Sequence, residues 1–315
     1  MNARSLMSQC SYCSRLRRML MAPPRRRFVA LLLVVGLIAP ALGGAQSRAL
    51  KILLTNDDGF DSAGLKAMKT ALAAAGHEVT VVAPVTNQSS TSMSMTSGTL
   101  KVDNKGEGVW AVHGTPADAA TIGLAHLLRD TPQDLVVSGT NAGQNLGNSA
   151  NGSGTVSAAI AAARLGVPAI ATSAGLGADA GTAYEIAAAL TTQMIASLIA
   201  ARPGGGKLLP DRLVINMNVP AVPAGRLQGI KWASLSHRSS YTRVYTPGEN
   251  PGEVRSRLAL STEPLAETDT DLALFNQGYV TLTLLDGDLT AATAPSSSVA
   301  SVLSKLALPE LARKN

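Results

Sequence analysis

The chain has 315 residues, of which 46 % are hydrophobic, 15 % charged and 3 % aromatic, a length that allows one large domain or two small ones. Its formal charge of +6 comes from 27 basic residues against 21 acidic ones, but seven of the basic residues lie in the first 45 positions, which hold no acid. The remaining 20 basic and 21 acidic residues give −1, so bulk charge gives no indication of binding to nucleic acid or to an anionic membrane.

The first 45 residues have the pattern of a secretory signal peptide. Arginines precede an apolar run at 28–42, and small residues follow it up to Ala45, where we expect cleavage. The alternative is an uncleaved anchor, but 15 residues interrupted by Pro40 are short for a membrane span. We therefore expect a periplasmic or secreted protein that begins near Gln46. It would be cytoplasmic if the leader reflects a wrongly chosen start, and Met19 or Met21 would give a more usual leader length.

Both cysteines, Cys10 and Cys13, lie in this leader. The mature chain would therefore have no thiol for a disulfide or for a zinc site.

Beyond the leader, short apolar runs alternate with helix-like stretches. Strands are expected at 51–55, 78–83, 134–138, 168–172 and 212–216, helices at 62–75, 116–129, 155–165 and 182–201, and a short strand pair at 98–102 and 109–112. Strands separated by helices of this length form right-handed βαβ units with a mostly parallel sheet. We expect a Rossmann-like three-layer α/β sandwich, in one domain over 46–315.

The pattern changes after Pro220. Strands are expected at 231–235, 241–245, 255–260 and 279–284, with no long helix between them, and a last helix near 297–306. We interpret 220–290 as a β-rich extension that projects from the α/β body as hairpins and serves oligomerisation.

Three polar loops follow three of the expected strands and should meet at the carboxyl edge of the sheet, where open α/β sheets bind ligands. The first holds Asn56, Asp57 and Asp58, the second spans 84–90 and the third spans 138–147. They offer carboxylate, hydroxyl and amide oxygens, which suit a hard cation such as Mg²⁺ or Mn²⁺. The alternative for the two aspartates is simple capping of the helix that follows, which needs only one of them.

The third loop leads to Ser153, Gly154 and Thr155 at the start of an Ala-rich helix. The free N–H groups and the dipole of a helix N-terminus favour a phosphate there. An ordinary Ser or Thr cap is the alternative, and the neighbouring cation loops favour phosphate. The chain contains no G-x-S-x-G, which argues against an α/β-hydrolase.

In this order the motifs resemble the survival protein SurE family of metal-dependent nucleotidases. The matching segments are ILLTNDDG at 52–59, APVTNQS at 83–89, GTPAD at 114–118, VVSGTNAGQNLG at 136–147 and SGTV at 153–156. A weaker match includes Thr270 and Asp271, followed by Gly278, Tyr279 and Val280.

The resemblance implies a phosphomonoesterase that acts on nucleoside 5′- and 3′-monophosphates. It implies one Mg²⁺ or Mn²⁺ per subunit, and dimers or tetramers that exchange C-terminal segments. The family's metal ligands fall on Asp57, Asp58, Ser89 and Asn141, and the residues beside the phosphate fall on Asn145, Ser153, Gly154 and Thr155. Departures from the family pattern at Gln88, Asn148, Ser149 and Gly152 bear on substrate preference and leave every metal ligand in place.

The expected reaction is metal-assisted hydrolysis. The cation would polarise a phosphoryl oxygen and lower the pKa of a bound water, and Asp57 or Asp58 would orient or deprotonate that water as the catalytic carboxylate. A phosphatase with a covalent Asp nucleophile usually has two aspartates separated by one residue, unlike this adjacent pair. A periplasmic nucleotide- or phosphoester-binding protein without turnover, or a phosphatase of a non-nucleotide substrate, are the alternatives.

Overall fold

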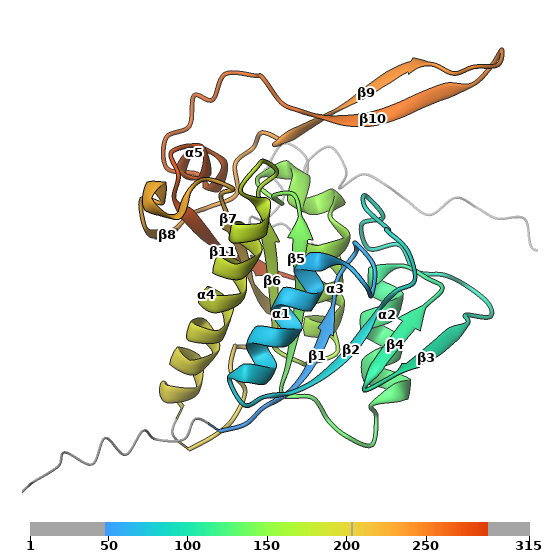
Figure 1. Cartoon of the computed structure of the whole chain (residues 1–315), viewed down its shortest axis with the longest axis vertical. Coiled ribbons are helices and arrows are strands. Elements are labelled where there is room, and N and C mark those ends of the chain that lie inside the picture. Colours follow the sequence, from blue (N-terminus) through green and yellow to red (C-terminus); the bar gives the residue numbers. More distant parts are fainter. Residues whose placement is uncertain (1–47, 203, 289–315) are drawn as a thin grey trace, which may run out of the picture. The chain divides into compact units, whose positions relative to one another are not determined.

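The computed structural model describes residues 48–202 and 204–288, and these residues form a nine-stranded sheet and a separate two-stranded sheet (Figure 1). The strands of the large sheet are, in chain order, β1 (Lys51–Thr55), β2 (Glu78–Pro84), β3 (Val102–Gly106), β4 (Val109–Val112), β5 (Leu135–Ala142), β6 (Ala169–Ala174), β7 (Leu213–Val219), β8 (Ile230–Trp232) and β11 (Val280–Asp286). The expected leader, 1–45, and the expected last helix, 297–306, lie outside the described residues.

The large sheet has the order β3-β4-β2-β1-β5-β6-β7-β11-β8. Its six inner strands from β4 to β7 run parallel, while β3 is antiparallel to β4 and β11 is antiparallel to β7. Since β8 pairs with β11 in the parallel sense, the last two strands both run against the six inner strands. The prediction of a mostly parallel sheet is confirmed.

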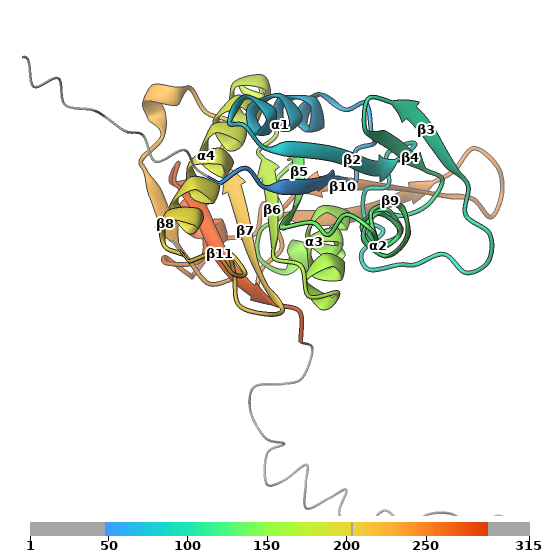
Figure 2. The ribbon, with the colours of Figure 1, turned by 90° about the horizontal axis from the view of Figure 1, so that it is seen from below.

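Helices cover both faces of this sheet. They are α1 (Ala63–Ala74), α2 (Pro116–Ile122), α3 (Gly154–Arg164), α4 (Ala180–Ala200) and the short α5 (Asp271–Asn276). Figure 2 shows α1 and α4 together on one face and α2 and α3 together on the other, in agreement with their mutual contacts. The three layers are those expected.

The alternation of side chains along β1 explains why both layers pack on it. Ile52 and Leu54 belong to the apolar core beneath α1 and α4, whereas Leu53 belongs to the core beneath α2 and α3. A strand buried on both faces reads as a continuous apolar run, as β1 does. Glycine lets α1 approach closely, because a Cβ on Gly64 would lie 2.0 Å from the carbonyl oxygen of Thr140 on β5.

Several elements differ in extent from their predictions. The first strand of the short pair is Val102–Gly106 rather than 98–102, and β5 continues to Ala142, into the segment expected as a loop. The helix expected at 116–129 ends as α2 at Ile122 and continues as a five-residue π-helical turn.

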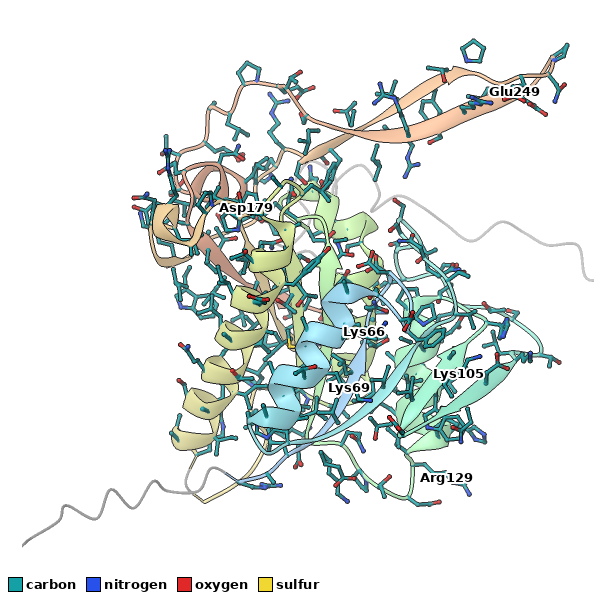
Figure 3. The ribbon with its side chains drawn as sticks, viewed as in Figure 1. Lys66, Lys69, Lys105, Arg129, Asp179 and Glu249 are labelled. Carbon is teal, nitrogen blue, oxygen red and sulfur yellow. The ribbon has the colours of Figure 1, made fainter. Side chains whose placement is uncertain are left out.

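Only part of the 220–290 segment projects from the body. β9 (Tyr241–Pro247) and β10 (Val254–Leu260) form the separate antiparallel sheet, and Figure 3 shows Glu249 near the tip of this hairpin. The strands β8 and β11 instead join the large sheet, and α5 lies between β10 and β11. The prediction of a projecting hairpin is therefore correct for β9–β10 and wrong for β8 and β11.

Candidate functional site

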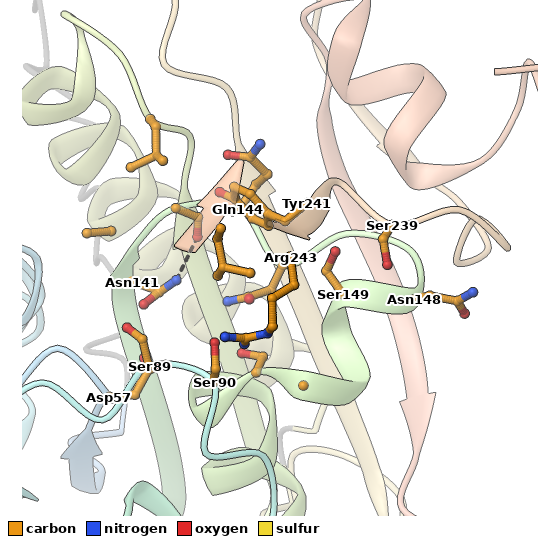
Figure 4. Close-up of a pocket in the computed structure, with 17 residues that line it drawn as sticks. Asp57, Ser89, Ser90, Asn141, Gln144, Asn148, Ser149, Ser239, Tyr241 and Arg243 are labelled. Atoms are coloured by element: carbon orange, nitrogen blue, oxygen red, sulfur yellow. Dashed lines mark hydrogen bonds between the residues drawn. The ribbon is translucent and has the colours of Figure 1, made fainter. Parts of the chain in front are cut away.

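The three polar loops meet at the carboxyl edge of β1, β2 and β5, as the sequence predicts. Asp57, Ser89 and Asn141, one from each loop, line a single cavity of about 390 Å³ (Figure 4). β1 lies between β2 and β5 in the sheet, which brings the ends of these strands side by side.

Asn56 holds the first loop in its turn. Its side-chain amide donates to the carbonyl oxygen of Gly59 at 3.0 Å and to Oγ of Ser62 at 2.7 Å, and it accepts from the amide of Gly59 at 3.2 Å. Gly59 adopts φ 108°, a conformation that side chains rarely allow. The tight turn leaves the Asp57 and Asp58 carboxylates free for other contacts.

Neither carboxylate caps α1. The N-cap residue is Ser62, which makes no side-chain cap hydrogen bond. Asp57 Oδ1 accepts from the Thr155 hydroxyl at 2.5 Å, while Asp58 accepts from the amide of Ala142 at 2.9 Å and from Asn87 Nδ2 at 3.3 Å. The Asp pair thus joins the first loop to the second and third loops and to α3.

Burial dominates the electrostatics of the Asp pair. Asp57 is 3 % exposed, and desolvation raises its pKa to about 6 against the opposing hydrogen bond from Thr155, with the Asp58 charge raising it further. Burial also raises the pKa of Asp58, with the Ala142 amide acting in the opposite direction. The buried Asp57 and the half-buried Asp58 together are a favourable place for a cation.

Asn141 and Ser89 present oxygens to the same cavity. The Asn141 amide nitrogen donates to the carbonyl oxygen of Gly143 at 2.7 Å, which leaves its Oδ1 as the end available to a ligand. The second loop is held against the first because the amide of Gln88 donates to the carbonyl oxygen of Asp57 at 2.7 Å. Figure 4 shows the Ser89 side chain on the same side of the cavity as Asp57 and Asn141.

This donor set fits a hard cation. Two carboxylates, one hydroxyl and one amide oxygen are the ligand types of Mg²⁺ and Mn²⁺. Within 48–202 and 204–288, no three His, Cys, Asp or Glu side chains gather, so Asp57 and Asp58 would need the Ser89 and Asn141 oxygens to complete a ligand set.

The residues expected beside the phosphate divide into two groups. Asn145 and Ser153 line the cavity. Asn145 is fixed by its Nδ2, which donates to Ser173 Oγ at 2.8 Å, and by its amide, which donates to Asn218 Oδ1 at 2.7 Å. Ser153 caps α3, with its Oγ accepting from the amide of Val156 at 3.1 Å.

Gly154 and Thr155 lie behind the cavity wall, against Asp57. The Thr155 hydroxyl is used to hold the Asp57 carboxylate. A Cβ on Gly154 would lie 2.7 Å from Asp57 Cβ and 2.9 Å from Pro116 Cγ, so glycine is needed for α3 to begin this close to the carboxylate. Sequence reasoning missed this positioning of Asp57.

Sequence reasoning also did not assign the hairpin residues or Asp271 to the site. Tyr241, Arg243 and Leu258 of the hairpin line the cavity opposite the loops, and nothing in their strand-like sequence indicated this. Asp271, fully buried, accepts from the amides of Gly147, Ser236 and Leu272. Its weak family match was the signal that could have identified it.

Comparison with known proteins identifies a family for this chain. Residues 52–242 match the family model described as survival protein SurE. The 5′-nucleotidase SurE of Actinobacillus succinogenes is 37 % identical over 247 residues, which cover 77 % of this chain and 94 % of that protein. The 5′/3′-nucleotidase SurE of Erwinia tasmaniensis is 37 % identical over 248 residues, 78 % of this chain and 93 % of that one.

A solved structure is similar as well. The SurE protein from Aquifex aeolicus superposes with a TM-score of 0.67 at 32 % identity, covering 80 % of this chain and 99 % of that one. With the family model matched over most of the chain and relatives of this similarity along nearly their whole length, the chain belongs to the SurE family.

Proposed function

We propose that this protein is a metal-dependent phosphomonoesterase that hydrolyses nucleoside 5′-monophosphates, and 3′-monophosphates, to nucleoside and phosphate. The observation that carries the proposal is the meeting of Asp57, Ser89 and Asn141 in one cavity beside the N-terminus of α3. The names of the relatives, 5′-nucleotidase and 5′/3′-nucleotidase, support the same substrate class.

One Mg²⁺ or Mn²⁺ per subunit would be held by Asp57, Asp58, Ser89 and Asn141. When bound, it would withdraw charge from a phosphoryl oxygen and make a nearby water more acidic. Burial raises the pKa of Asp57 to about 6 when no cation is present, and a bound cation would keep both aspartates ionised. The Asp pair would therefore orient the attacking water or remove its proton.

The start of α3 would stabilise charge on the phosphoryl group. The N–H groups of Gly154 and Thr155 lie against Asp57, so the helix start would act on the phosphoryl group through the positive end of its dipole, next to Ser153, which lines the cavity. Donors fixed before the reaction stabilise developing charge most effectively. Asn145, locked by Ser173 and Asn218, would be a second fixed group on this wall.

The test is phosphate release by the chain beginning at Gln46, measured across a panel of nucleoside monophosphates with Mg²⁺, with Mn²⁺ and with EDTA. We expect release that depends on the metal and that Asp57→Ala and Asp58→Ala abolish while both variants remain folded. A folded wild-type protein that binds nucleotide without releasing phosphate would contradict hydrolysis and favour a binding role.

We also propose that the chain forms a homodimer or tetramer through the β9–β10 hairpin. The register pairs Tyr245 with Ser256, and alternate residues share one face, which carries Tyr241, Tyr245, Val254, Leu258 and Leu260. Tyr245 is 64 % and Val254 66 % exposed, an apolar surface suited to a second copy.

The leader supports export to the periplasm, followed by cleavage near Ala45. Mass spectrometry of the protein from the periplasmic fraction should find a mature N-terminus near Gln46. An unprocessed chain recovered from the cytosol would contradict export.

A further inference from the structure

The cavity wall contributed by the hairpin contains a cation. Arg243 on β9 is the one basic residue among the described residues that line the cavity. Figure 4 shows its guanidinium directed into the cavity on the side of Ser90, the residue that follows the predicted ligand Ser89. The side chain therefore points toward the loops that carry the predicted metal ligands.

The base of the hairpin is attached to the residues that follow the third loop, which fixes the backbone from which Arg243 extends. The amide of Asn148 donates to the carbonyl oxygen of Arg238 at 2.9 Å, and the amide of Ser240 donates to Ser149 Oγ at 2.9 Å. The phenolic oxygen of Tyr241 would lie 3.0 Å from a Cβ on Gly143, two residues after Asn141.

Arg243 has little of its hydrogen-bonding capacity occupied. Its Nη1 donates to Ser256 Oγ at 2.9 Å, and no carboxylate in the described part of the chain lies within 4.0 Å of it. Nearby arginines are paired, Arg238 with Glu263 at 2.6 Å and Arg255 with Glu249. A guanidinium has five donors and stays charged, so most of the Arg243 donors remain available for a ligand.

We infer that Arg243 binds a phosphoryl oxygen of the substrate, so that the hairpin supplies the positive charge of the substrate site. This inference rests on the proposed function. A phosphomonoester brings up to two negative charges into a cavity whose other lining side chains are uncharged apart from Asp57. A guanidinium matches phosphate oxygens with paired hydrogen bonds, which fix orientation as well as charge.

The experiment compares Arg243→Met, which keeps the apolar stem, Arg243→Lys, which keeps the charge, and the matched control Arg257→Met. Arg257 pairs with Val244 and lies on the opposite face of the same hairpin. KM and kcat are measured for 5′-AMP and for p-nitrophenyl phosphate, which lacks a nucleoside, together with the inhibition constant of inorganic phosphate. Calorimetry of Mn²⁺ binding and light scattering check the cation site and the assembly.

We expect Arg243→Met to raise both KM values and the phosphate inhibition constant by about 10- to 100-fold, the usual effect of losing a charged hydrogen bond. Arg243→Lys should lie between wild type and Arg243→Met, and Arg257→Met should stay within about twofold of wild type. Mn²⁺ affinity should be unchanged in all three. Unchanged KM values and phosphate inhibition in Arg243→Met would overturn the inference, as would an effect confined to 5′-AMP, which would place Arg243 on the nucleoside.

Failure of the proposed function gives a different result. If the wild-type protein hydrolyses no phosphomonoester, calorimetry with inorganic phosphate and Mn²⁺ still decides the role of Arg243. Weaker phosphate binding by Arg243→Met than by wild type would support it. Equal binding, or no phosphate binding by wild type, would overturn it.

Discussion

Asp57 is a carboxylate that the fold keeps from water beside a second carboxylate, and burial raises its pKa to about 6 when no cation is bound. Burial costs the ionised group its hydration, and one hydrogen bond from Thr155 does not replace that hydration. A bound cation would reverse the balance by stabilising both ionised aspartates. The metal-free site therefore lowers stability at neutral pH.

The raised pKa of Asp57 makes the stability of the metal-free protein depend on pH. The Asp57 pKa rises from 3.8 to about 6 on folding, so the stability that this group contributes is present below pH 3.8 and is lost as pH rises through about 6. One pKa unit corresponds to about 1.4 kcal/mol, so the loss is about 3 kcal/mol. Asp57→Asn should not lose this stability as the pH rises, and it should therefore be more stable than wild type at pH 7.

The measurement is urea unfolding of both proteins in EDTA between pH 4 and pH 7. With Mn²⁺ added, wild type should gain stability and Asp57→Asn should not. Stability curves of the two proteins that run parallel across this pH range would show that Asp57 is not protonated in the folded state.

The close contact between Gly154 and Asp57 can be tested by adding a methyl group at Gly154. A methyl group there would lie 2.7 Å from Asp57 Cβ, so in Gly154→Ala either the carboxylate or the start of α3 must move. We expect Mn²⁺ affinity to fall at least about tenfold and the free energy of unfolding to fall by about 1–3 kcal/mol. Gly181→Ala, in the first turn of α4 with nothing within 4 Å of the added methyl, is the control; it should leave Mn²⁺ affinity unchanged and raise the free energy of unfolding by at most about 1 kcal/mol. Equal Mn²⁺ affinity in both variants would show that the contact tolerates a methyl group.

At the scale of elements, local pattern predicted the α/β body well because each strand and helix there carries its own periodicity. β1 has the predicted bounds, Lys51–Thr55, and the other parallel strands lie within a few residues of theirs. β5 was predicted too short because Thr140 and Asn141 are polar, yet both are buried in the strand. Burial of polar residues at a sheet edge is a tertiary property that the local pattern does not contain.

The C-terminal strands show the same limit. Alternation identified β8 and β11 as strands but not their partners, and β11 pairs with β7, with Leu282 opposite Met217. The six residues of α5 are too few to show a helical period. At the site, spacing brought the three loops together correctly, whereas the contacts of Thr155 and Arg243 depend on how distant elements pack.

Asp271 connects two of these elements. Its carboxylate accepts from the amide of Gly147 in the third loop and from that of Ser236 before the hairpin, each at 2.9 Å. Asp271→Ala would leave buried donors unpaired, at a cost of about 3 kcal/mol or more. We expect a lower unfolding midpoint and a raised KM, because the loop that lines the cavity loses its attachment.

The matched control is Asp269→Ala, an exposed aspartate two residues earlier. Unfolding midpoints and KM values are measured for both variants. Asp271→Ala with wild-type stability would show that the buried carboxylate contributes no net stabilisation, and an unchanged KM would show that the third loop keeps its position without it.

At the scale of the whole molecule, the hairpin has an apolar face that the described residues leave exposed to solvent. One face carries Tyr245 and Val254, both mostly exposed, and the opposite face carries Thr242, Thr246 and Arg257. The same apolar face supplies Tyr241 and Leu258 to the cavity. A second copy that covered the outer half would hold the hairpin in place over the substrate site, which links assembly to catalysis.

The last prediction follows from this link. In Tyr245→Ser/Val254→Ser the apolar surface near the hairpin tip is removed, and we expect the molar mass in light scattering to fall from an oligomer toward a monomer. The control, Thr246→Ala/Arg257→Ala on the polar face, should keep the wild-type mass. Because Arg243 extends from the same strand, the dissociated variant should also show a higher KM with unchanged Mn²⁺ affinity. An unchanged mass would place the subunit contact elsewhere, while dissociation with an unchanged KM would show that the hairpin holds its position over the cavity without a partner.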